Sequence, residues 1–128
     1  MARILLVDDE EMDRTIGKAI LEGAGHELFY APNGEVALRT YMSHDIDLVI
    51  TDLVMPNLNG ILLIQELRKL DRNALVLALT GVSPEQLDRA KEAGAASIMR
   101  KPYTPQALLQ AVTNLLETRI VGPDDFWY

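Results

Sequence analysis

Five short apolar runs alternate with segments of helical periodicity along the chain, and few folds are compatible with this alternation. Nearly continuous apolar runs suit strands that are covered on both faces, as in parallel sheets. The runs lie at residues 4–7, 28–31, 46–50 and 75–79, with a weaker one at residues 97–99. Alternating strands and helices favour a parallel sheet with helices on both faces and right-handed crossovers. We therefore predict an α/β, doubly wound fold.

The segments between the runs carry apolar side chains three and four residues apart, which is typical of amphipathic helices. Clear examples are Met12, Ile16, Ala19 and Ile20; Leu63, Ile64, Leu67 and Leu70; and Leu108, Ala111, Val112 and Leu115. A hydroxyl residue followed by proline indicates two helix starts, at Ser83-Pro84 and Thr104-Pro105. The pattern thus predicts five consecutive β-α units.

Length and composition favour one domain and exclude several classes of protein. The 128 residues match a usual domain size, and a hydrophobic content of 48% is enough to fill a core. The formal net charge of −7 argues against direct nucleic-acid binding, which depends on Lys and Arg neutralising phosphates. The lack of cysteine excludes disulfides and thiolate metal sites. Because no long apolar run or signal peptide is present, we expect no membrane association and a cytoplasmic location.

Polar side chains able to do chemistry follow four of the five apolar runs. Asp8 and Asp9 follow the first run, Asp52 the third, Thr80 the fourth and Lys101 the fifth. In open α/β sheets, ligands bind beyond the carboxyl ends of the strands. We therefore expect three carboxylates, a hydroxyl and an ammonium group to converge at one edge of the sheet.

Three carboxylates held together need a cation. Two unit charges about 4 Å apart repel by roughly 4 kcal/mol at an effective dielectric constant of about 20. A ligand set of oxygen atoms without histidine favours Mg²⁺, with Mn²⁺ as the alternative, and protein-bound Mg²⁺ often pairs with phosphate. The sequence therefore implies a divalent-metal site at this edge, with Mg²⁺ as the favoured ion.

Taken together and in their order along the chain, these motifs resemble those of the receiver domain of two-component response regulators. The resemblance covers residues 3 to about 119 and rests on Val7-Asp8-Asp9, Asp52 with Met55-Pro56 and Gly60, Thr80-Gly81, and Lys101-Pro102-Tyr103. It implies a flavodoxin-like (βα)5 fold whose five-stranded parallel sheet has the order 2-1-3-4-5, as in the chemotaxis member of the family. Residues 1–120 would form the receiver domain, and residues 121–128 a C-terminal tail or the start of a linker.

The resemblance also implies a role for each candidate residue. Asp52 would accept the phosphoryl group, while Thr80 and Lys101 would bind its oxygen atoms. The Mg²⁺ ligands would be Asp9, the Asp52 carboxylate and the Val54 backbone carbonyl, with Asp8 helping through water. Phosphoryl transfer needs in-line positioning and neutralisation of negative charge, which Mg²⁺ and Lys101 would supply. A cis peptide bond before Pro102 would aim Lys101 into the site.

A receiver domain of this kind would not be an enzyme in the ordinary sense, because it would catalyse only its own phosphorylation and dephosphorylation. Its phosphodonor would be a histidine kinase or phosphotransfer protein. Phosphorylation would change the surface formed by the fourth helix, fifth strand and fifth helix and so control an output. Ile98 stands where many receivers carry an aromatic switch, and Gly94-Ala95-Ala96-Ser97 lacks the acidic residues of one dimerising subfamily. We expect a monomer or a weak, phosphorylation-dependent dimer.

Three other functions compete with this interpretation. An aspartate-nucleophile phosphatase of the haloacid dehalogenase type normally has its two aspartates two residues apart, whereas Asp8 and Asp9 are adjacent. A degenerate receiver acting only as a binding module is disfavoured because all five site residues are present. A dinucleotide oxidoreductase is disfavoured because Val7 leads into acidic residues instead of a glycine-rich turn.

Overall fold

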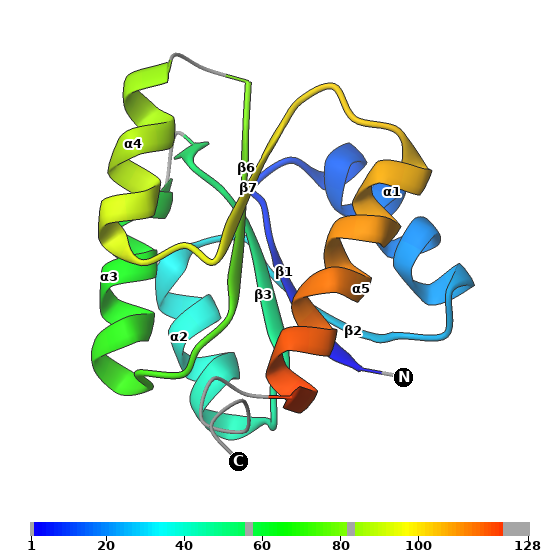
Figure 1. Cartoon of the computed structure of the whole chain (residues 1–128), viewed down its shortest axis with the longest axis horizontal. Coiled ribbons are helices and arrows are strands. Elements are labelled where there is room, and N and C mark those ends of the chain that lie inside the picture. The colour runs from blue at the N-terminus through cyan, green and yellow to red at the C-terminus, as the bar shows by residue number, and fades with distance from the viewer. Residues whose placement is uncertain (1, 56–57, 82–83, 122–128) are drawn as a thin grey trace.

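A five-stranded parallel sheet forms the centre of the structure, a computed structural model that describes residues 2–55, 58–81 and 84–121 (Figure 1). Its strands are β1 (Arg3–Val7), β2 (Glu27–Ala31), β3 (Leu48–Asp52), β6 (Val76–Thr80) and β7 (Ser97–Arg100). They lie in the order β2-β1-β3-β6-β7, with all neighbours parallel. This is the predicted order 2-1-3-4-5, so the α/β doubly wound fold is confirmed.

Helices cover both faces of the sheet (Figure 1). One face carries α1 (Glu11–Gly23) and α5 (Pro105–Val121), and the other α2 (Gly34–Ser43), α3 (Gly60–Leu70) and α4 (Pro84–Ala93). Because successive strand residues point to opposite faces, Leu5 joins the core beneath α3 whereas Ile4 joins the core beneath α5. Within the described residues, none of these helices has the length and hydropathy needed to cross a membrane.

Two strands extend further toward their carboxyl ends than the apolar runs suggested. β3 includes Thr51 and Asp52, and β6 includes Thr80. Thr51 and Thr80 are both buried, with exposed fractions of 0% and 1%. Asp52 and Thr80 are therefore the last residues of strands rather than the first residues of loops, and the strand pairing holds their backbones.

A short antiparallel pair, β4 (Val54–Met55) and β5 (Leu58–Asn59), joins β3 to α3 and was not predicted. Asn59 then caps α3, since its side-chain oxygen accepts hydrogen bonds from the N–H groups of Ile61 and Leu62. The predicted Thr104 cap is present at α5. The predicted Ser83 cap and residues 122–128 of the predicted tail lie outside the described residues.

Candidate functional site

The carboxyl ends of four strands bring the candidate residues to one edge of the sheet. Asp8 follows β1, Asp52 ends β3, Thr80 ends β6 and Lys101 follows β7. Backbone hydrogen bonds hold the last two together, because the Lys101 N–H donates to the Thr80 carbonyl at 2.8 Å. The predicted convergence of Asp8, Asp52, Thr80 and Lys101 follows directly from the parallel sheet.

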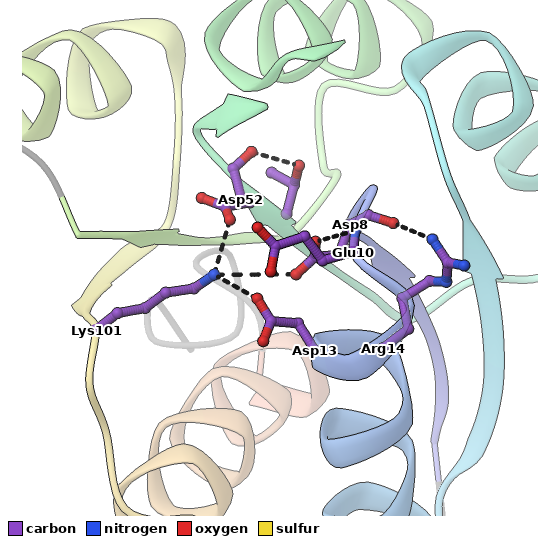
Figure 2. Close-up of polar contacts among 7 residues, drawn as sticks. Asp8, Glu10, Asp13, Arg14, Asp52 and Lys101 are labelled. Atoms are coloured by element: carbon purple, nitrogen blue, oxygen red, sulfur yellow. Dashed lines mark hydrogen bonds and ion pairs between the residues drawn. The ribbon is translucent and has the colours of Figure 1, made fainter. Parts of the chain in front are cut away.

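Lys101 is the centre of this cluster (Figure 2). Its Nζ donates a hydrogen bond to Asp52 Oδ2 at 2.7 Å, and lies 3.4 Å from Asp13 Oδ2 and 3.9 Å from Asp8 Oδ2. The exposed fractions of the side chains are 6% for Asp8, 15% for Asp52, 26% for Lys101 and 39% for Asp13. One ammonium group thus lies among carboxylates from three separate elements.

Burial and the charge of neighbouring groups shift the pKa values of Lys101 and Asp8 in opposite directions. Burial alone would lower the pKa of Lys101, but its hydrogen bond to Asp52 and the nearby carboxylates outweigh burial and raise it. Burial raises the pKa of Asp8, although a backbone hydrogen bond and the Lys101 charge oppose this shift. Burial also raises the pKa of the neighbouring Tyr103. Lys101 therefore remains a cation throughout the physiological pH range.

Local hydrogen bonds position the end of β1. The Glu10 N–H donates to Asp8 Oδ1 at 2.9 Å, and Arg14 Nη1 donates to the Asp8 backbone carbonyl at 2.8 Å (Figure 2). The Arg14 guanidinium lies 5.5 Å from the centre of the Tyr30 ring on β2, within cation-π range. These contacts tie the Asp8 backbone and side chain to α1 and β2.

The other predicted residues lie close by in the chain. Asp9 is half-buried and directly follows Asp8, and the backbone of Val54 belongs to β4, paired with Asn59. Within residues 2–55, 58–81 and 84–121, no three His, Cys, Asp or Glu side chains are grouped so that they could hold a metal ion. The roles of Asp9 and Val54 as metal ligands therefore stay predictions.

Asp13 is the site residue that the sequence analysis missed. It lies in the first turn of α1, four residues after Asp9, and its carboxylate contacts Lys101. An acidic residue in a first helical turn is common, since it interacts favourably with the helix dipole. No local signal singled it out, since Asp9 precedes α1 and helical spacing does not relate the two residues.

Comparisons with known proteins identify the family. The sequence pattern of the response regulator receiver domain matches residues 4–113. This chain belongs to that family. Chemotaxis protein CheY of Halobacterium salinarum is 33% identical over 115 residues, which cover 89% of this chain and 96% of that protein. Sensory/regulatory protein RpfC of Xanthomonas campestris is 31% identical over 118 residues. That alignment covers 88% of this chain but only 16% of RpfC, which is a much longer protein.

Solved receiver structures agree with this assignment. The response regulator TrrA of Thermotoga maritima, solved in complex with Mg²⁺-BeF, superposes with a TM-score of 0.82 and 36% identity. The alignment covers 90% of this receiver and 99% of TrrA. The predicted family is thus confirmed, in preference to the phosphatase and dinucleotide alternatives. The cis peptide bond expected between Lys101 and Pro102 is also present.

Proposed function

We propose that this receiver domain accepts a phosphoryl group on Asp52 and passes the resulting change to an output through its α4–β7–α5 surface. The observation that carries the proposal is the placement of the Lys101 ammonium group 2.7 Å from the Asp52 carboxylate at the carboxyl edge of the sheet. A nucleophile beside a permanent cation is the arrangement that transfer of an anionic group requires.

In the proposed reaction, an Asp52 carboxylate oxygen attacks the phosphorus atom of the donor. The new P–O bond forms as the bond to the leaving group breaks, and the leaving group keeps the bonding electrons. Lys101 pairs with one phosphoryl oxygen, and the buried Thr80 hydroxyl at the end of the neighbouring strand donates to another. Asp52 acts as a nucleophile and not as a general base.

The donor set at this edge fits a hard divalent cation, because it consists of carboxylate and carbonyl oxygens. Asp9, Asp52 and the Val54 carbonyl would hold Mg²⁺, with Asp8 acting through water and Mn²⁺ as a substitute. When bound, the ion neutralises negative charge on the transferred group. The Mg²⁺-BeF complex of TrrA supports this choice of ion.

The proposed donor is a histidine kinase or a phosphotransfer protein, and the domain turns over no other substrate. Its acidic character, with a net charge of −7, argues against direct nucleic-acid binding. We propose a cytoplasmic location and a monomer or a weak phosphorylation-dependent dimer. The output partner would bind the α4–β7–α5 surface.

Intact-mass measurement after incubation with Mg²⁺ and acetyl phosphate tests this function. We expect the mass to rise by one phosphoryl group, peptide mapping to place the group on Asp52, and a chelator to prevent the change. p-Nitrophenyl phosphate should not be turned over. Sustained hydrolysis of that ester would favour the phosphatase alternative, and an unchanged mass with Mg²⁺ and donor present would favour a degenerate receiver.

Phosphorylation should alter the backbone between Thr80 and Lys101. Thr80 and Lys101 are both proposed to bind the phosphoryl group, and their direct backbone hydrogen bond couples the ends of β6 and β7. α4 lies between these strands in sequence and consists mostly of polar residues, so it should respond most easily. We expect beryllofluoride to change amide hydrogen exchange in residues 80–81 and 84–101 but not in β2. Unchanged exchange in those residues would contradict this route.

A further inference from the structure

Asp13 contributes a carboxylate to the site from a helix, α1. It projects from the first turn of α1, whereas Asp8 and Asp52 lie at strand ends (Figure 2). Its Oδ2 lies 3.4 Å from Lys101 Nζ, closer than the 3.9 Å that separates Asp8 Oδ2 from the same atom. The contact joins residues that are 88 positions apart in the sequence.

We propose that Asp13 is an electrostatic residue of the phosphoryl-transfer site, which strengthens divalent-cation binding and slows attack on dianionic phosphodonors more than on monoanionic ones. This inference rests on the proposed function. Asp13 touches Lys101 rather than the reacting atoms, so it acts through the charge of the site.

Counting formal charges gives the reason. Asp8, Asp9, Asp13 and Asp52 carry four negative charges, and Lys101 carries one positive charge. A bound divalent cation would therefore leave one excess negative charge, and removing the Asp13 charge would leave none. A more negative site attracts the cation more strongly and repels an incoming anion more strongly. The repulsion is proportional to the charge on the donor, so a dianion is disfavoured about twice as much in free energy as a monoanion.

The exposure of Asp13 limits the size of this effect. At 39% exposed, its side chain is partly screened by water and salt, whereas the Asp52 side chain is 15% exposed. We therefore expect changes of about threefold to tenfold at low ionic strength, which should shrink as salt is added.

Glu11 provides a matched control for the ordinary role of an acidic residue at a helix start. It lies two positions before Asp13 in the same first turn of α1 and would also interact with the helix dipole. Glu11, however, faces a hollow beside β2 that it lines with Arg14 and Tyr30. If Asp13 served only the helix dipole, Glu11→Gln and Asp13→Asn would have similar effects.

The experiment compares the parent protein, Asp13→Asn and Glu11→Gln. Mg²⁺ affinity is measured by titration calorimetry without a phosphodonor. Phosphorylation rates are measured by intact mass at saturating Mg²⁺ near neutral pH, with acetyl phosphate as the dianionic donor and phosphoramidate as the monoanionic donor. For Asp13→Asn we expect Mg²⁺ affinity to fall, and the acetyl phosphate to phosphoramidate rate ratio to rise, each by about threefold to tenfold.

Glu11→Gln should change neither the Mg²⁺ affinity nor the donor rate ratio by more than about twofold. Added salt should reduce the effects of Asp13→Asn on both quantities. The proposal is overturned if Asp13→Asn matches Glu11→Gln in Mg²⁺ affinity and in the donor ratio, whatever its stability. A parent protein that incorporates no phosphoryl group from either donor would instead refute the proposed function. Calorimetry and the donor ratio therefore separate the two failures.

Discussion

Replacing Asp52 with asparagine is expected to abolish phosphoryl incorporation. An amide oxygen lacks the negative charge that makes the carboxylate a nucleophile, so the attack on phosphorus loses its electron source. The substitution also removes the closest charge partner of Lys101, whose Nζ lies 2.7 Å from Asp52 Oδ2. Intact mass with Mg²⁺ and acetyl phosphate should therefore show no added phosphoryl group in the variant under conditions that convert the parent.

The variant should remain folded, because Lys101 keeps its ion pairs with Asp8 and Asp13. Asp88→Asn is the matched control, since Asp88 is an exposed aspartate on α4 and the substitution removes the same charge. It should retain full incorporation. A phosphoryl group still found on the Asp52→Asn variant would assign the acceptor to another carboxylate.

Gly60→Ala should destabilise the domain strongly. A Cβ at Gly60 would overlap the Asp52 carbonyl oxygen and lie 2.7 Å from Leu53 Cα. Both are backbone atoms, which cannot rotate away as a side chain could. Gly60 also donates its N–H to the Leu53 carbonyl at 3.0 Å, so moving it would break that bond. We expect the free energy of unfolding in urea to fall by about 2–3 kcal/mol.

Because the clash falls on the backbone of the proposed acceptor, Gly60→Ala should also slow phosphorylation of the folded fraction. Gly23→Ala is the control, since a Cβ at this last residue of α1 meets nothing within 4 Å. It should change stability by less than about 1 kcal/mol, toward greater stability, because alanine loses less backbone entropy in a helix. Equal changes in the free energy of unfolding for the two substitutions would show that the close backbone approach at Gly60 does not determine its contribution to stability.

The strand-helix alternation was readable from the sequence because it reflects burial. Strands such as β1 and β3 are covered on both faces, so their apolar runs are nearly continuous. The convergence of Asp8, Asp52, Thr80 and Lys101 could also be predicted, because parallel strands all end at the same edge. For these residues, local patterns and a general rule of topology were sufficient.

Other features depended on contacts between distant segments. The strand character of Thr51 and Thr80 was hidden because both are polar, and their burial depends on how distant segments pack together. The short β4–β5 pair has two residues in each strand, too few to show a period. The apolar pattern therefore marked the centres of the strands better than their carboxyl ends.

Local sequence patterns were enough to predict the five β-α units, the acidic residues after β1 and the family. The place of Asp13 in the site and the packing of Gly60 against the Asp52 backbone became visible only in the folded chain. The physical reason is the range of the interactions. Periodicity and capping depend on residues within a few positions of one another, whereas the Asp13–Lys101 contact depends on how α1 packs against the sheet to which β7 belongs.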